Sequence, residues 1–299
     1  MKSKLFNIRC DNCGSEYRIS SRGEMNCPFC GSKIYLNDAD FKEYQKTRDE
    51  ILNRDRWAND EVNNNGDVLN LWTDDNTVVF ESETGKTINC SYTYYYEGKG
   101  KLKDIYVGRN KIAIVYNNPK DVQMFNANTN FIKYPSADIK GMSKFLPNIV
   151  FDTELKDGKI LVVYSKPENV YPLAITKNLD AKHVAWMISR MENLGCLLEF
   201  NNMCFNNISL TDFYFNPKTH EIYLLDGWEN VSIESNPTML YLWRMRDYAR
   251  QIMNLSTAPE MCIEFLNSKP AEDAYTDFKN WNEVIEHGFN GHNFHQFEM

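Results

Sequence analysis

Four cysteines within the first 30 residues form two pairs with the same spacing, and no other feature of the sequence constrains the fold as strongly. The pairs read "CDNCG" (Cys10, Cys13) and "CPFCG" (Cys27, Cys30), with 13 residues between them. Cysteines at this spacing allow one tight turn to direct both sulfur atoms at a single ion, and the glycine after each pair favours such a turn. Four thiolates suit a tetrahedral Zn²⁺ ion with no open coordination position. We therefore expect a structural zinc site, because so short a segment cannot bury enough surface to fold without its metal.

Residues 8–36 resemble a zinc ribbon, with "SEYRISSRGEMN" predicting strand, turn and strand around Arg22-Gly23. Redox-active or disulfide-bonded cysteines would not explain two glycine-terminated turns. Zinc ribbons often bind nucleic acid, so the charge of the segment matters. Residues 1–36 hold six Lys/Arg and three Asp/Glu. With Zn²⁺ and four thiolates the net charge is about +1, which is a weak basis for binding phosphates. We expect a ribbon that docks on a protein, or one that is purely structural, at least as readily as one that binds nucleic acid.

The composition of the whole chain limits its class. The formal net charge of −8 over 299 residues argues against general coating of nucleic acid. No apolar run approaches the roughly 20 residues of a membrane-spanning helix, and the first residues lack an apolar signal core, so we expect a cytoplasmic protein without a membrane segment. The cysteines outside the first 30 residues have apolar or aromatic neighbours and are expected to be small buried side chains. They are Cys90, Cys196, Cys204 and Cys262.

A connecting region, residues 39–66, follows the predicted ribbon of residues 1–38. "DADFKEYQKTRDEILNRDRW" predicts a modest amphipathic helix, and "ANDEVNNNGD" predicts an exposed hinge that is rich in turn formers. The apolar side of that helix comprises Phe41, Tyr44, Ile51 and Leu52.

The remaining sequence reads as strands first and helices later, with the change near residue 178. β-Branched and aromatic runs separated by Gly, Asn or Asp predict strands at 77–82, 87–96, 104–109, 111–116 and 159–165, with one helix at 121–135. Helical spacing predicts helices at 179–200, 239–255, 259–267 and 271–289, with Asp180 available as an N-cap of the first. Two hairpin-like stretches, "FYFNP" and "EIYLLDG", interrupt the helical part.

A sheet lobe, a helical lobe and an inserted strand pair ending in Asp-Gly resemble the protein-kinase fold over residues 83–299, most closely a degenerate kinase-like group of bacteria and phages. The resemblance rests on the order of "GRNKIAIVYNNP", "FLPNIVF", "ILVVYSKPENVYPL", "AKHVAWMISRMENLGCLLEFNN" and the aromatic-rich tail from Asp273. It implies an α+β, two-lobed fold, with an N-lobe at 67–168 and a C-lobe at 169–299.

The resemblance also assigns positions in the sheet lobe. A kinase needs a Lys on the nucleotide phosphates and a Glu that holds it. The glycine-rich loop would fall at "YEGKGKLKD", where Gly98 and Gly100 fit but a third glycine is missing; a plain hairpin turn explains this stretch equally well. The Lys position falls on Ile114, and the alternation of a strand points Lys111 to the opposite face. The Glu position falls in "MFNANTNF", which contains no acid; Ala127 or Asn128 takes its place.

In the helical lobe, "FNNISLTD" matches the catalytic loop. Phe205 replaces its His, Asn207 replaces the Asp that accepts the substrate proton, and Asp212 stands at the metal-binding Asn. The amide of Asn207 cannot serve as a general base, whereas Asp212 could coordinate a hard cation. Asp226-Gly227-Trp228 matches the second metal-binding motif and keeps its Asp. Asp226 could contact a metal or nucleotide, or could form structural hydrogen bonds at a strand end.

The simultaneous loss at the Lys, Glu and base positions predicts a pseudokinase that binds a protein partner. In this hypothesis no cation reaches the pocket from the sheet lobe. One alternative is an atypical phospho- or nucleotidyl-transferase that binds ATP/Mg²⁺ through Asp212 and Asp226. Another is a nucleic-acid-binding adaptor led by the ribbon.

Two further groups receive only structural interpretations. The five histidines show no metal-ligand spacing with one another or with nearby Cys; they include His183 on a helix and His220 in a turn. The basic stretch "RMRDYAR" predicts a solvated helix face, with Arg244 or Asp247 near the position at which kinases bury an Asp that braces the catalytic loop.

Overall fold

The computed structural model describes most of the chain from residue 69 onward and part of the first 42 residues. The described residues are 3–4, 7–10, 12–13, 16–18, 23–27, 30–36, 39, 42, 69–98, 102–135, 139–234, 238–292 and 297. The apolar side chains of the predicted connecting helix, the exposed hinge before residue 66, and Gly100 all lie outside them. Those predictions remain expectations.

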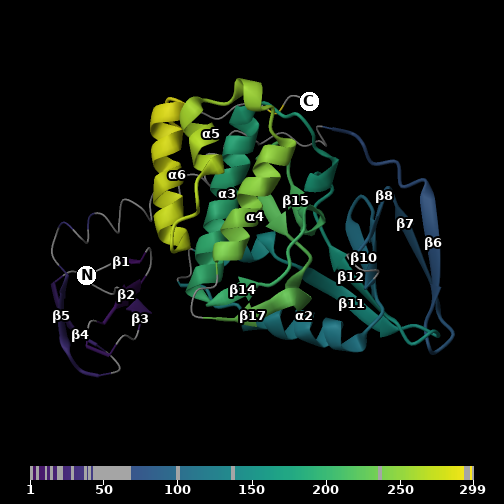
Figure 1. Ribbon diagram of the computed structural model, residues 1–299. Coiled ribbons are helices and arrows are strands. Elements are labelled where there is room, and N and C mark those ends of the chain that lie inside the picture. Colours follow the sequence, from purple (N-terminus) through teal and green to yellow (C-terminus); the bar gives the residue numbers. More distant parts are fainter. Residues whose placement is uncertain are drawn as a thin grey trace.

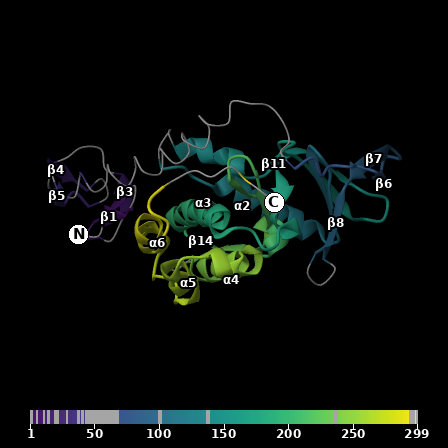
Figure 2. The same ribbon diagram turned by 90° about the horizontal axis from the view of Figure 1, so that it is seen from above.

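The N-terminal unit is made of short antiparallel strands and lies at the opposite end of the molecule from the β6–β7 hairpin (Figures 1 and 2). Both predicted strands between the cysteine pairs are present, but each pairs with a strand outside that segment rather than with the other. The two sheets are β1 (Ser3–Lys4), β2 (Asn7–Arg9) and β3 (Glu16–Arg18), and β4 (Gly23–Asn26) with β5 (Lys33–Leu36).

The sheet lobe contains a five-stranded antiparallel sheet in the order β11-β12-β10-β9-β8. Its strands are β8 (Tyr94–Glu97), β9 (Lys103–Val107), β10 (Lys111–Tyr116), β11 (Asn148–Glu154) and β12 (Ile160–Ser165). A separate hairpin consists of β6 (Asn76–Glu81) and β7 (Thr87–Tyr92). The strand predicted at 87–96 is therefore two strands, β7 and β8, which separate at Thr93.

Both faces of β10 are covered, which explains its continuous apolar sequence. Ile112, Ile114 and Tyr116 face the main core, on the side of helix α2 (Pro119–Phe131). Ala113 and Val115 face a second cluster that includes side chains of the β6–β7 hairpin. Successive side chains of a strand point to opposite faces, so a strand between two apolar layers shows no polar alternation.

The helical lobe is built around α3 (Ala181–Phe200), whose residues are buried along nearly the whole length of the helix. As predicted, Asp180 caps it: the carboxylate accepts a hydrogen bond from the backbone N–H of Lys182 at 2.9 Å. Helices α4 (Met239–Ile252) and α6 (Ala274–Gly288) pack against it, and α5 (Glu260–Asn267) packs against α4 and α6 (Figure 1). All four predicted helices are present.

Short segments complete this lobe. The strands are β13 (Tyr171–Pro172), β14 (Met203–Phe205), β15 (Phe213–Phe215), β16 (Ile222–Leu224) and β17 (Val231–Ile233). The 3₁₀ segments are η2 (Ile139–Phe145), which precedes β11, and η3 (Leu173–Ile175), η4 (Leu210–Asp212), η5 (Trp228–Asn230) and η6 (Leu255–Thr257).

The predicted two-lobed, kinase-like α+β architecture is confirmed. A helix lies between the third and fourth strands of the five-stranded sheet, and the β15–β16 hairpin leads into the Asp226 turn. Residues 166–170, here called the connector, join β12 of the sheet lobe to β13 of the helical lobe. In the described part of the chain, no helix combines the length and the apolar character needed to cross a membrane.

A buried ion pair ties α4 to α6. The Arg246 guanidinium donates to both carboxylate oxygens of Asp277 at 2.7 and 2.9 Å, and also to the Phe265 carbonyl at 3.1 Å. The two charged side chains are at most 1% exposed. The prediction that the stretch 244–250 is a solvated face is therefore wrong for Arg246, because the Asp277 carboxylate compensates its charge inside the protein. It holds for Arg244 on the same helix, which forms a largely exposed pair with Asp247.

We expect Arg246→Ala to lower the free energy of unfolding by about 3–5 kcal/mol, because it leaves the Asp277 carboxylate buried without its cation. Arg244→Ala, which removes an exposed ion pair from the same helix, should cost less than about 1 kcal/mol. Urea unfolding followed by circular dichroism measures both. Equal losses in the two variants would contradict the role assigned to the buried pair.

Candidate functional site

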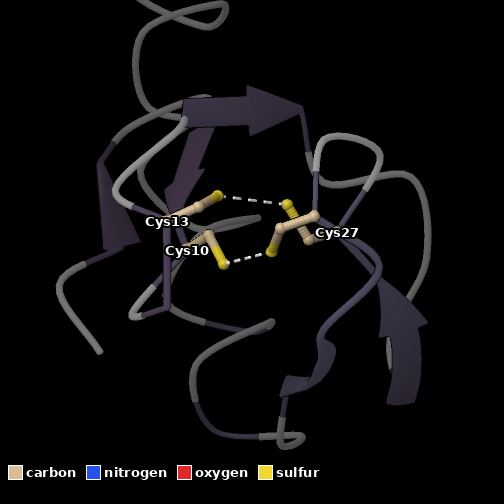
Figure 3. Close-up of side chains that lie close together, drawn as sticks. Cys10, Cys13 and Cys27 are labelled. Atoms are coloured by element: carbon tan, nitrogen blue, oxygen red, sulfur yellow. Dashed lines mark hydrogen bonds between the residues drawn. The ribbon is translucent and has the colours of Figure 1, made fainter.

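The four N-terminal cysteines come together as the sequence predicted. All their sulfur atoms lie within 4.8 Å of one another. Cys10 and Cys30 are 3.6 Å apart and Cys13 and Cys27 are 3.7 Å apart (Figure 3). A tetrahedral ion with metal–sulfur bonds of about 2.3 Å requires sulfur atoms about 3.8 Å apart, so this geometry fits one metal ion. Gly31, at φ +73°, follows the second pair in the positive-φ conformation expected of it.

We expect one Zn²⁺ ion per chain, lost in Cys27→Ser because three thiolates and a hydroxyl bind the ion far more weakly. Elemental analysis of the purified protein measures the stoichiometry. Cys262→Ser, at a buried cysteine of α5 outside this cluster, should keep the metal. An unchanged metal content in Cys27→Ser would contradict the assignment.

The second group of interest lies where the two lobes meet, and it begins with Lys103. On β9, Lys103, Ile105 and Val107 face inward, and the register pairs Ile105 with Ile114 on β10. Directly paired residues of adjacent strands share a face of the sheet. Lys103 therefore projects from the same face as Ile114, the fully buried residue at the predicted lysine position, but from the neighbouring strand.

The expectation that the sheet lobe supplies no cation to this pocket is wrong. The Lys103 ammonium lies 2.7 Å from Oδ1 of Asp226 and 2.6 Å from Oε1 of Glu229, and the three side chains are at most 10% exposed. The resemblance places the lysine on the third strand of the fold, at Ile114, and no local pattern marks Lys103 on the neighbouring strand instead. We refer to Lys103, Asp226, Glu229 and Asp212 as the interlobe cluster.

The acid that holds the lysine has also changed position. Asn128 occupies the predicted Glu position on α2, and its amide donates to the carbonyls of Trp228 at 2.8 Å and Val231 at 3.2 Å. Asn128 thus fixes the segment after Asp226 against α2, while Glu229 within that segment supplies the carboxylate. Ala127, the other predicted position, is exposed on α2.

Gly98 makes room for the lysine. Its N–H donates to the Lys103 carbonyl at 2.8 Å, and a Cβ placed on it would lie 2.6 Å from Cγ of Lys103. A side chain at this position would therefore displace the Lys103 stem. The structural reason for Gly98 is contact with Lys103; its predicted role in binding a nucleotide remains a hypothesis.

The turn at Asp226 requires glycine next to it. Gly227 has φ +84°, and a Cβ there would lie 2.9 Å from Oδ2 of Asp212. Phe205, at the predicted His position, is fully buried and packs edge-on against Trp228 with ring centroids 5.1 Å apart. An apolar contact thus stands where the resemblance expects a polar one.

Asp212 is buried and already has a structural function. Its Oδ2 accepts the backbone N–H of Ser209 at 2.7 Å, which closes a capping box on η4. Burial and the neighbouring Asp226 charge raise the pKa of the Asp212 carboxyl to about 8. In this arrangement of the cluster the shift favours the protonated form of Asp212.

The remaining charges of the cluster are unevenly balanced. Burial, followed by the Asp226 charge, raises the pKa of Glu229. Burial opposes the charged form of Lys103, but Asp226 and Glu229 outweigh it and raise the lysine pKa. Among the described residues, Oδ2 of Asp226 and Oε2 of Glu229 are buried without a hydrogen-bond partner. The single positive charge of Lys103 therefore does not neutralise both carboxylates of Asp226 and Glu229, and the cluster keeps an excess of negative charge.

The carboxylates of Asp212, Asp226 and Glu229 do not form a metal site in this arrangement. In the described part of the chain, only the cysteine cluster brings three or more Cys, His, Asp or Glu donor atoms within 4.8 Å of one another. Asp212 and Asp226 lie close together, as the sequence suggested, but a cation between them would require a rearrangement of the cluster.

The loop that contains Asn207 is braced from α4, although not by the predicted residues. Asn207 is half-buried between β14 and η4. The next residue, Ile208, accepts a hydrogen bond at its carbonyl from the Tyr248 hydroxyl at 2.7 Å. Arg244 and Asp247 instead form the exposed ion pair described above. The buried Tyr248, next to Asp247 in the sequence, therefore braces this loop, and the charged residues predicted for that role do not.

A histidine pair escaped sequence analysis. Nδ1 of His183 on α3 lies 3.0 Å from Nε2 of His220, both side chains are buried, and Phe297 packs on both rings. The two residues are 37 positions apart, so no local spacing could have indicated the contact.

We expect Asp212→Asn to stabilise the protein at pH 8 but not at pH 4. The pKa of Asp212 is higher in the folded state, so its contribution to stability is complete below the ordinary aspartate pKa of 3.8 and is lost as the pH rises toward 8. An amide removes that loss, and each kcal/mol recovered should raise Tm by about 2–4 °C. Melting curves at both pH values test this. A Tm difference that does not depend on pH would exclude Asp212 as the titrating group.

Comparisons with known proteins find similarity to solved structures only, at low sequence identity. No protein-family model matches the sequence, and no curated protein matches it. The solved structures it resembles include WbdD in a co-crystal with a kinase inhibitor, at 13% identity and a TM-score of 0.44; that match covers 66% of this chain and 46% of the WbdD chain. The match thus spans about half the length of WbdD.

Two further similar structures are those of a kinase domain and a kinase. The ROP18 kinase domain in complex with AMP-PNP and sucrose shares 12% identity at a TM-score of 0.41, covering 78% of this chain and 93% of that one. Vaccinia related kinase 3 shares 9% identity at a TM-score of 0.44, and that match covers 70% of this chain and 90% of the kinase chain. Similarity this low transfers no ligand, substrate or residue role to the present chain.

Proposed function

We propose that this protein is a zinc-ribbon pseudokinase, in which the kinase-like domain binds a partner protein and the interlobe cluster is a structural clasp. The observation that carries this proposal is the position of Lys103. Its ammonium is held by Asp226 and Glu229 at 2.7 and 2.6 Å in a region closed to solvent.

Phosphoryl transfer needs a lysine on the nucleotide phosphates and a carboxylate on the metal ion. Here the lysine and the carboxylate are bound to each other, and the second carboxylate, Asp212, is bound to a backbone N–H. Entry of a nucleotide would break charge-assisted hydrogen bonds that are among the stronger ones in proteins. Asn207 also offers no basic oxygen at the position of the proton acceptor. These contacts favour a structural role for the cluster.

An apolar edge strand offers a surface for a protein partner. β11 lies at the edge of the five-stranded sheet, and its consecutive residues Ile149, Val150 and Phe151 are 36%, 55% and 40% exposed. A cleft of about 610 Å³ opens beside the start of this strand, between Pro147 and Pro167. Exposed strand edges are common sites for the addition of an extended peptide.

Nucleotide binding provides the test. We expect no rise in Tm and no hydrolysis when millimolar Mg·ATP or Mn·ATP is added to the full chain. A ligand at 100 times its Kd would stabilise the folded state by about 2.7 kcal/mol, which is readily seen in a melting curve. The variants are Lys103→Met, in the cluster, and Lys111→Met, at an exposed lysine of the adjacent strand.

A rise in Tm with phosphoryl transfer in the wild type and in Lys111→Met, both absent from Lys103→Met, would overturn the pseudokinase proposal. It would establish Lys103 as a nucleotide-binding residue instead.

One observation supports a second candidate, an atypical metal-dependent phospho- or nucleotidyl-transferase. Asp226 and Glu229 each bury an oxygen without a hydrogen-bond partner among the described residues, and a divalent cation would balance this excess of negative charge. Mass spectrometry of the protein and of candidate substrates incubated with Mn·ATP distinguishes the two candidates. A phosphoryl or adenylyl adduct that disappears in Asp226→Asn would favour the transferase.

A further inference from the structure

Residues 69–74 cross the boundary between the two lobes without forming a strand or a helix. Trp72 is the most deeply inserted side chain of this segment: it is 4% exposed, whereas the preceding Leu71 is 37% exposed. Leu69 is partly buried against the main core. We call residues 69–74 the strap.

Trp72 contacts the connector and the first strand of the helical lobe. Its indole N–H donates to the Glu168 carbonyl at 2.6 Å, and its ring stacks on Tyr171 with centroids 4.4 Å apart and planes 12° apart. The Lys166 ammonium lies 3.9 Å from the centre of the same ring. In addition, the backbone N–H of Leu71 donates to the Tyr171 hydroxyl at 3.1 Å.

The strap is fixed equally to the sheet lobe. The Trp72 carbonyl accepts a hydrogen bond from the Arg109 guanidinium at 3.2 Å, and the indole ring meets Tyr94 of β8 edge-on at 5.5 Å. Asp74 accepts the Arg109 backbone N–H at 3.2 Å and the Thr93 hydroxyl at 2.9 Å. One short segment thus holds the sheet lobe, the connector and the helical lobe at once.

A change in the angle between lobes requires backbone rotation in the segment that joins them. Here that segment is residues 166–170, and the strap binds it on one side while Lys166 donates to the Arg109 carbonyl at 2.5 Å. The interlobe cluster also joins the two lobes, from β9 to the turn after β16. Asn128 of α2 joins the lobes as well, through its bonds to the Trp228 and Val231 carbonyls. The strap is therefore one of several contacts that must yield before the lobes separate.

We propose that the strap is a removable lock on the angle between the lobes, and that withdrawal of the Trp72 side chain opens the boundary where Lys103 meets Asp226 and Glu229. The lock is reversible because release of Trp72 disrupts no strand and no helix. This inference goes beyond the proposed function, since it holds whether or not the cluster binds nucleotide.

Hydrogen exchange of the full-length, zinc-loaded protein tests the lock through mass spectrometry of three peptides. These cover the connector, the β9 segment that begins at Lys103, and α6 as an internal reference. In Trp72→Ala we expect exchange roughly 5–30-fold faster in both the connector and the β9 peptide, with α6 unchanged. Leu71→Ala removes an exposed side chain of the same segment but keeps the backbone bond to Tyr171, and should match the wild type.

Trp72→Phe removes the indole donor to Glu168 while keeping an aromatic ring over Tyr171, and should give a smaller increase in the same two peptides. It decides the question if Trp72→Ala does not fold. Faster exchange confined to the strap and connector, with the β9 peptide unchanged, would overturn the proposal. So would an equal response of Leu71→Ala.

Discussion

The Lys103 ion pairs are the interaction on which the arrangement of the lobes depends. A buried ammonium is costly unless carboxylates compensate its charge, and the two carboxylates come from the opposite lobe. The sheet lobe therefore supplies the ammonium group, and the helical lobe supplies the carboxylates that compensate its charge. Such a pair is weak evidence for net stability, since desolvation offsets much of the attraction. Its stronger consequence is specificity, because separation of the lobes would leave charges buried without partners.

The pocket retains a lysine–acid pair built from different positions. Lys103 comes from the strand next to the expected one, Glu229 follows Asp226 instead of lying on α2, and Gly98 has no side chain where the lysine passes. Asn128 holds the Glu229 segment against α2 with two hydrogen bonds. A lysine in the pocket removes the electrostatic argument for inactivity that rested on its absence. The pseudokinase proposal is supported instead by the pairing of Lys103 with Asp226 and Glu229, by Asn207 at the position of the proton acceptor, and by the burial of the cluster.

Local sequence patterns predicted most of the secondary structure. The helices at 181–200, 239–252, 260–267 and 274–288 agree with their predicted ranges to within three residues at each end. Hydrophobic periodicity and caps such as Asp180 are local signals, and so is the spacing of the four cysteines. Two errors concern strands: β11 (Asn148–Glu154) was not predicted, and the predicted strand at 87–96 is two strands of different sheets. The β-favouring residues on both sides of Thr93 give no local sign of that junction.

The sequence by itself determined the cysteine cluster, the order of lobes, and the identity of residues such as Asn207 and Asp226, because each depends on residue type and short spacing. Only the tertiary structure decided which groups meet across the lobes. Lys103 and Asp226 are 123 positions apart, and Trp72 and Glu168 are 96 apart. Strand register brings a side chain to a given face and depth, and register follows from packing of the whole sheet rather than from any local pattern.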